Sequence, residues 1–263
     1  MLKKLLKYDL KNINKVLIIF YSLSITFAVI TRLLFLIKDS FIMNILAQIS
    51  SGITISMMFN IVINNIMRLW ARFRSNFYKD ESYLTHTLPA DKKTLYLSKT
   101  IASIITLLTS IIVIGITLFI AYYSKENIEI LKQLIMPLVE IYDIGMVKII
   151  ILILYVLFLE FLNAVGVGYT GIILGNRSNN NKLTLTLIYG FIAYMISQII
   201  GLLFVFIAGI FNKDIMNLFF TNEIINIDVI KYIIYLSIIG YSIIIIINYF
   251  INIKLFNKGV NVD

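Results

Sequence analysis

The sequence predicts an all-α integral membrane protein with six transmembrane helices, and two observations carry this prediction. First, 60% of the 263 residues are hydrophobic and only 14% are charged, whereas about a quarter of the residues in a soluble domain are charged. Second, six stretches are long and apolar enough to cross a bilayer, which takes roughly 20 residues per helix. They are residues 16–37, 42–67, 100–123, 147–175, 183–211 and 229–253. We expect one membrane domain over residues 1–263.

Helices are expected for these spans because backbone polar groups find no water in hydrocarbon, so only helices and closed barrels cross it. Strands of a barrel would be about 10 residues long with alternating polarity, whereas these stretches are longer and apolar on all sides. The first stretch lacks a small-residue cleavage site, and Arg32 and Lys38 come at its end. We therefore expect it to be a retained span and not a signal peptide.

The N-terminal residues 1–15 have a helical pattern of their own. Leucine and isoleucine recur at helical spacing with lysines between them, which favours an amphipathic helix that lies in the inner membrane interface. A solvated charged tail is the alternative.

Charge predicts the orientation of the spans. If both termini lie on the same side, that side carries sixteen Lys and Arg against five acidic residues, and the other side carries six Lys against eight acidic residues. Because cytoplasmic loops are rich in Lys and Arg, both termini and residues 68–99 are expected in the cytoplasm. The net charge of +9 then reflects orientation. No domain remains to present a basic nucleic-acid-binding face.

Residues 68–99 concentrate charge and aromatic side chains between the second and third spans. Seven of the 23 Lys and Arg residues lie there. Pro89 suits the first turn of a new helix and Asp91 its positive end, so we expect a helix extension, a short helix, a turn and a helix leading into span three. Lipid-binding clusters are mainly basic. The interleaved acidic and aromatic residues here favour a docking surface over a loop that only touches headgroups.

The sequence lacks the residues that several kinds of functional site require. There is no cysteine and only one histidine, His86, so thiolate sites and the two-histidine zinc motif are excluded. No P-loop and no GxSxG turn occurs, which argues against ATP binding by this chain and against an intramembrane enzyme. We expect no cofactor or metal on this chain, and His86 is most simply a loop residue.

A row of polar residues marks the second span. It recurs every four residues, which makes it a slow spiral on one side of a helix. Since polar groups are costly in lipid, the row should face protein or water. It forms a helix–helix interface with amide hydrogen bonds or one wall of a translocation path, and both can hold if the path lies at a dimer interface. Its members are Asn44, Gln48, Gly52, Ser56, Asn60, Asn64 and Arg68.

Two charged residues and a set of small residues complete the candidates. Glu160 lies near the middle of span four, where a carboxylate is expensive and often functional, and Arg32 in span one is a possible partner. A structural ion pair or a protonated glutamic acid is the simpler interpretation. Gly171 and Gly175 form a GxxxG pair, which more often serves packing within a chain than dimerisation.

The loop also carries a resemblance. Residues 77–99, FYKDESYLTHTLPADKKTLYLSK, resemble a segment of six-helix, ABC-2-like permease subunits of bacterial ABC exporters, especially those of Firmicutes. Residues 164–182 (AVGVGYTGIILGNRSNNNK), Gln198 and the ending 248–263 (NYFINIKLFNKGVNVD) are similar to this group as well. The resemblance is strongest at residues 77–99 and mainly a matter of hydropathy elsewhere.

The resemblance implies partners and roles. Such permeases reside in the bacterial plasma membrane and pair, as homodimers or heterodimers, with two copies of a separate ATPase that binds ATP and Mg²⁺. The loop between spans two and three supplies a coupling helix that docks on the ATPase. On this chain the coupling contacts would be Phe77, Tyr78, Asp80, Glu81, Tyr83 and Leu84.

The resemblance also implies a substrate class. Relatives handle amphipathic or antimicrobial peptides, either for export or for resistance to them, so we expect export of a hydrophobic or amphipathic peptide. A path lined by Asn, Ser, Met57 and Met58 would suit such a peptide. The residues that line this path or a dimer interface are Gln48, Ser56, Asn60 and Asn64. The alternative function is a membrane anchor or sensor that transports nothing and signals through the same loop.

Overall fold

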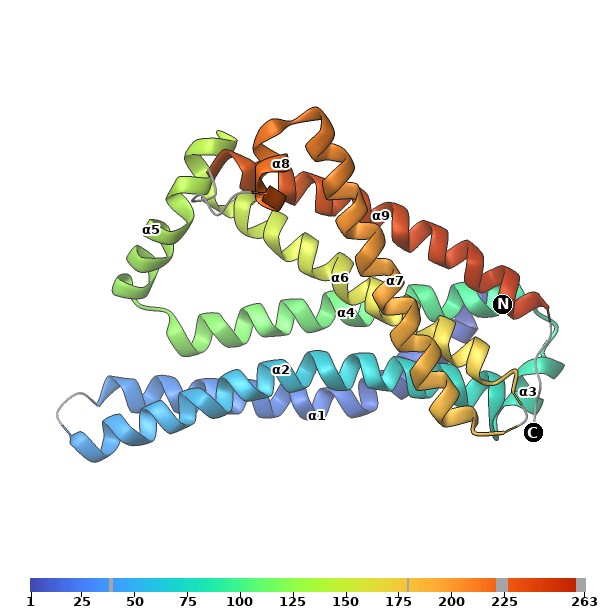
Figure 1. The fold of residues 1–263 in the computed structure, drawn as a ribbon. Coiled ribbons are helices and arrows are strands. Elements are labelled where there is room, and N and C mark those ends of the chain that lie inside the picture. The colour runs from blue at the N-terminus through green and yellow to red at the C-terminus, as the bar shows by residue number, and fades with distance from the viewer. Residues whose placement is uncertain (38–39, 179, 221–226, 259–263) are drawn as a thin grey trace. The chain divides into compact units, whose positions relative to one another are not determined.

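The computed structural model describes residues 1–37, 40–178, 180–220 and 227–258, and over these ranges it contains helices and no strands (Figure 1). The helices in chain order are α1 (Leu2–Leu36), α2 (Phe41–Tyr78), α3 (Ser82–Thr87), α4 (Lys92–Tyr122), α5 (Lys125–Tyr142), α6 (Met146–Gly175), α7 (Lys182–Phe211), α8 (Lys213–Phe220) and α9 (Ile227–Asn257). The all-α prediction is confirmed.

Six of these helices are long and apolar enough to span a membrane, as predicted: α1, α2, α4, α6, α7 and α9. Each contains one of the six stretches chosen from the sequence. Several residues that entered the sequence arguments lie outside the described residues, namely Lys38, Asp39, Glu223 and the ending 259–263.

The first helix differs from its prediction in one respect. We expected a separate interfacial helix over residues 1–15, but α1 is continuous from Leu2 to Leu36. Its lysines are exposed, whereas Asp9, Ile13 and Leu17 are buried. Protein therefore covers part of the face that was expected to meet lipid, and the interfacial location stays a prediction. No proline or glycine interrupts residues 2–36, which explains why the helix does not break.

The chain divides into two compact units, which are described separately. Unit 1 consists of Met1–Phe73 and Leu88–Ile130 and contains α1, most of α2, and α4. In lipid, packing and hydrogen bonds between helices replace the hydrophobic effect as the driving force. Accordingly, buried hydroxyl groups join the helices: Thr31 bonds Ser50 at 2.8 Å and Thr54 at 3.0 Å, and Ser24 bonds Thr117 at 3.1 Å.

Unit 2 consists of Arg74–Thr87 and Leu131–Asp263. Within it, α6 packs against both α7 and α9. The contact with α7 is very close: a Cβ atom added to Gly171 would lie 2.6 Å from the Cα atom of Gly190. The GxxxG pair thus serves packing within the chain, as the simpler interpretation had it. On the α9 side, the Thr170 hydroxyl lies 2.9 Å from the amide oxygens of both Asn248 and Asn252.

Most of residues 68–99 is helical, in the order that the sequence predicted. Helix α2 continues to Tyr78, α3 follows after a turn, and α4 begins at Lys92. Pro89 differs from its prediction, because it lies in the turn before Asp91, the residue that caps α4. The polar connection between α2 and α4 is therefore limited to residues 79–91.

Candidate functional site

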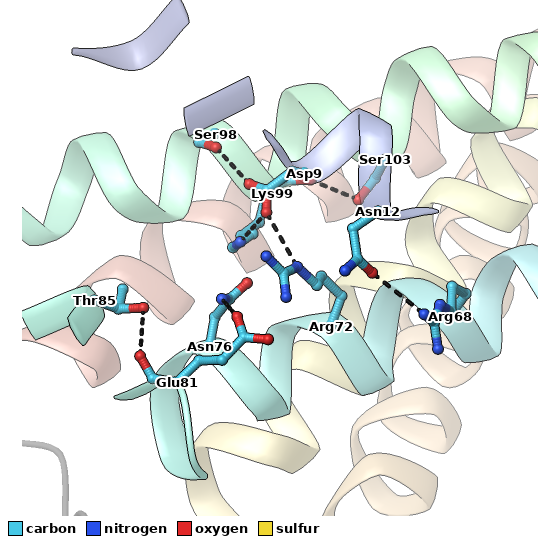
Figure 2. Close-up of polar contacts among 10 residues, drawn as sticks. All are labelled: Asp9, Asn12, Arg68, Arg72, Asn76, Glu81, Thr85, Ser98, Lys99 and Ser103. Atoms are coloured by element: carbon cyan, nitrogen blue, oxygen red, sulfur yellow. Dashed lines mark hydrogen bonds and ion pairs between the residues drawn. The ribbon is translucent and has the colours of Figure 1, made fainter. Parts of the chain in front are cut away.

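The segment around α3, within unit 2, is the candidate docking site. Its entry is a tight turn in which the Ser82 amide donates to the Lys79 carbonyl at 2.7 Å. The Asn76 side-chain amide donates to the Glu81 carboxylate at 2.6 Å, and Thr85 donates to the Glu81 carbonyl from both its amide and its hydroxyl. These contacts fix the start of a helix that is too short to be stable alone. Figure 2 shows Glu81 between Asn76 and Thr85.

Aromatic packing also holds the same segment in place. The Phe77 ring is fully buried and lies edge-on to Phe256 of α9, with 4.7 Å between centroids, and it also contacts His86. The His86 ring nitrogen Nε2 lies 3.3 Å from the Phe77 carbonyl oxygen. Tyr78 is 3% exposed. His86 therefore lies in α3, and not in a loop, and packs against Phe77, while the side chains of Phe77 and Tyr78 are buried.

The remaining predicted coupling residues divide by exposure. Tyr83 is 64% exposed and Leu84 is 73% exposed, side by side on α3, and Asp80 is exposed in the preceding turn. Glu81 is half-buried because its carboxylate faces Asn76. The outer face of this segment therefore consists of an acidic, an aromatic and an aliphatic side chain. We call Asp80, Tyr83 and Leu84 the α3 surface.

A buried ionic cluster in unit 1 was missed by sequence reasoning. The carboxylate of Asp9, a residue only 3% exposed, accepts from Lys99 Nζ at 2.5 Å and from the Ser98 hydroxyl at 2.9 Å. Arg72 Nε lies 3.5 Å from the same carboxylate. Figure 2 shows these contacts joining α1, α2 and α4. The cluster connects the N-terminal parts of α1 and α4 with the C-terminal part of α2, close to the start of the polar connection.

Within the described part of unit 1, most of the polar row of α2 lies away from the buried helix contacts. Gln48 and Ser56 are exposed, and Asn60 and Asn64 are half-buried. The two asparagine amides donate to carbonyls of their own helix, Asn60 to Ser56 and Asn64 to Asn60, both at 2.9 Å. At the C-terminal end of the row, Arg68 donates to Asn12 of α1 at 3.3 Å.

A neighbouring face of α2 makes the internal contacts instead. It carries the buried residues Ala47, Ser50, Thr54, Met58, Ile61, Asn65, Leu69 and Phe73. The exposed row is therefore a second, separate face. Its two predicted roles, a wall of a path or an interface with another copy, both stay predictions.

The two intramembrane charges have polar partners in their own units. Arg32 donates to the backbone carbonyl of Tyr123 in unit 1. Glu160 accepts from the Tyr194 hydroxyl at 3.1 Å and from the Gln198 amide at 3.3 Å in unit 2.

The six apolar helices define the class: this chain is a multi-pass membrane protein. Comparison of the chain with protein-family models, with curated proteins and with solved structures gave no match. Within the described part of the chain, no three His, Cys, Asp or Glu residues are grouped so that they could hold a metal ion.

Proposed function

We propose that this chain is the permease subunit of an ATP-driven exporter. In this proposal it pairs with a second permease copy and with two separate ATPase subunits, which bind ATP and Mg²⁺. It moves a hydrophobic or amphipathic substrate, a cytotoxic or antimicrobial peptide in our hypothesis, out of a bacterial plasma membrane. Both termini and the α3 surface lie in the cytoplasm, as the charge distribution indicates.

The observation that carries the proposal is the α3 surface. Tyr83 and Leu84 are large side chains with most of their area exposed, on a short helix held by buried contacts. The segment is flanked by charged residues and belongs to no span. A rigid aromatic and aliphatic pair at such a place suits insertion into a groove of a partner protein. Asp80 beside it would favour a groove with basic residues at its edge.

The buried residues take a different role in this proposal. Phe77 and Tyr78 resemble coupling residues of the family in sequence, yet they lie inside the unit. We assign them to fixing the direction of α3. Preorganisation of this kind improves binding because less conformational entropy is lost on docking.

The exposed row of α2 supports the transport part of the proposal. Polar side chains on a membrane-spanning helix need water or protein around them, and Gln48 and Ser56 lie exposed. The bonds of Asn60 and Asn64 to their own backbone lower the cost of leaving their amides unpaired by other helices. Such a face tolerates a changing environment, which a path between two permease copies would provide.

The experiment is co-expression and co-purification with a candidate ABC ATPase subunit, followed by ATP hydrolysis measured with and without an amphipathic peptide. The test variant combines Asp80→Arg, Tyr83→Ala and Leu84→Ala, which change the α3 surface. Glu81 is left unchanged because replacing it would break its contact with Asn76. We expect loss of the ATPase from the purified complex.

The matched control is Tyr123→Ala, which removes a half-exposed tyrosine on the predicted outer side. It should leave the complex intact. If the triple variant retains the ATPase and peptide-stimulated hydrolysis, the docking assignment is wrong. If the native complex forms but peptides never stimulate hydrolysis and none is transported, the sensor alternative replaces transport.

A further inference from the structure

Helix α5 joins two membrane-spanning helices through short linkers (Figure 1). Residues 123–124 connect it to α4, and residues 143–145 connect it to α6. The apolar stretches 100–123 and 147–175 flank it on both sides, and consecutive spans meet their connection at one membrane surface. Since extended chain covers at most about 3.6 Å per residue, each end of α5 lies within roughly 14 Å of the end of a span.

These linkers restrict the direction of α5 relative to the membrane. Its 18 residues extend about 27 Å at 1.5 Å per residue. With one end at the surface and the other about 14 Å above it, the helix would be tilted by only about 30°. Helix α5 therefore lies along the membrane surface, on the side that the charge distribution predicts to be the outer one.

One face of α5 packs inside unit 2. Ile135 and Tyr142 are buried together with Ile149 of α6. Leu138 and Val139 pack against the same cluster. Residues three, four and seven positions apart lie on one side of a helix, so these α5 side chains form a single apolar face. Their contact with α6 fixes the rotation of α5 about its own axis within unit 2.

The opposite side of α5 is mainly polar. Gln133 and Glu140 are exposed on it, with Pro137 between them and Met136 as an apolar exception. Proline has no backbone N–H, so the Gln133 carbonyl loses its ordinary helical donor. Because a carbonyl without a donor is costly in hydrocarbon, this side of the helix belongs in water or among lipid headgroups.

Two leucines lie between the packed face and the polar side. Leu134 is 70% exposed and Leu131 is 42% exposed, and their spacing of three positions places them next to each other on the helix surface. We call them the α5 leucine pair. When the polar side of α5 is turned away from the membrane, this pair is directed toward it. Contact with water would be unfavourable for both side chains.

We propose that the α5 leucine pair inserts into the lipid leaflet at this surface, at the boundary between headgroups and acyl chains. The two flanking spans favour lipid over a partner protein as the occupant, because they hold the helix beside the bilayer. The sequence of α5 contains two Lys and three Glu, so it offers no net positive charge to acidic headgroups. Apolar area, and not charge, holds the pair in the membrane.

The test measures how often two paramagnetic reagents collide with a nitroxide label on single-cysteine variants of the full chain in nanodiscs. The chain has no cysteine of its own, so each label reports one position. Oxygen concentrates in hydrocarbon, whereas nickel ethylenediaminediacetate stays in water. The oxygen-to-nickel collision ratio of Leu134→Cys should exceed that of Gln133→Cys at least about fivefold. It should agree within about twofold between phosphatidylcholine and phosphatidylglycerol nanodiscs.

Gln133→Cys is the matched control, because it is the adjacent position and lies on the polar side. Thermal unfolding establishes that each variant is folded. If Leu134→Cys does not fold, Leu131→Cys takes its place with the same expected ratio.

The proposal is overturned if the label at the leucine pair has the collision ratio of Gln133→Cys, which would place the pair in water. It is also overturned if that label is shielded from both reagents, since protein from this chain or a second copy would then cover the pair. Insertion into phosphatidylglycerol but not phosphatidylcholine would overturn the role of apolar area. No ATPase or peptide takes part, so failure here leaves the proposed function untouched.

Discussion

The substitution Asp9→Asn tests whether the buried cluster of unit 1 holds its three helices together. The amide has nearly the shape of the carboxylate, so packing and the hydrogen bond from Ser98 can persist. What disappears is the negative charge that faces Lys99 and Arg72. Lys99 is only 7% exposed. The substitution therefore isolates an electrostatic contribution from a steric one.

The expected cost follows from burial. Removing one partner of a buried ion pair costs about 3–5 kcal/mol, since the remaining charge stays buried without compensation. For chains of this size each kcal/mol corresponds to roughly 2–4 °C in the unfolding temperature. We therefore expect Asp9→Asn to lower the unfolding temperature of the detergent-solubilised chain by about 6–20 °C. Asp80→Asn, an exposed carboxylate, should stay within about 0.5 kcal/mol of the native chain.

A double-mutant cycle identifies the partner. Lys99→Met alone leaves Asp9 with Arg72 and Ser98, and the pair Asp9→Asn with Lys99→Met removes both charges. If the two residues interact as the 2.5 Å distance indicates, the double variant should be more stable than the sum of the single effects predicts, by roughly 0.5–3 kcal/mol. Thermal unfolding that changes by less than about 2 °C in Asp9→Asn, or a cycle that is additive, would refute the reasoning.

Three further outcomes are expected. Phe77→Ala should destabilise the contact with Phe256 by about 3–5 kcal/mol and accelerate tryptic cleavage in the α3 segment. Gly171→Leu should prevent the close contact between α6 and α7 and lower the yield of folded protein in size-exclusion chromatography, because the added Cβ meets the backbone of the neighbouring helix. Because the chain has no cysteine, single cysteines report topology directly: a membrane-impermeant maleimide should label Leu84→Cys from the cytoplasmic side and Ser124→Cys from the outer side.

Each of these has its own check. Gly115→Leu is the glycine control, since no atom lies within 4 Å of its added Cβ; equal loss of folded protein in both variants would contradict the packing argument. Unchanged proteolysis of Phe77→Ala would show that α3 does not depend on the aromatic contact. Labelling of both cysteines from one side would disprove the predicted orientation.

Most of the structural predictions that were confirmed depended on local sequence patterns. Hydropathy over windows of about 20 residues found all six long helices, because such helices depend on their own composition. The order of elements in residues 68–99 followed from charge and aromatic residues, although Pro89 lies in the turn before α4 and not in its first turn. Gly171 and Gly175 indicated close packing, which the structure assigns to α6 and α7.

The contacts that sequence reasoning missed join distant positions. Asp9 was counted only as a cytoplasmic acid, although Lys99 lies beside it across 90 positions of sequence. Glu160 was matched with Arg32 by depth, whereas it accepts from Tyr194 and Gln198 of α7. Phe77 and Tyr78 were assigned as coupling contacts through the resemblance, and the structure buries both, with Phe77 packed against Phe256 of α9. A single sequence contains no signal for such pairings.

The length of α2 has a mechanical consequence. Its 38 residues extend about 57 Å at 1.5 Å per residue, nearly twice the hydrocarbon thickness of about 30 Å. Because α2 is one continuous helix, a tilt of about 10° would displace one end relative to the other by about 10 Å. A small tilt of α2 would thereby produce a large displacement of the end that leads into α3.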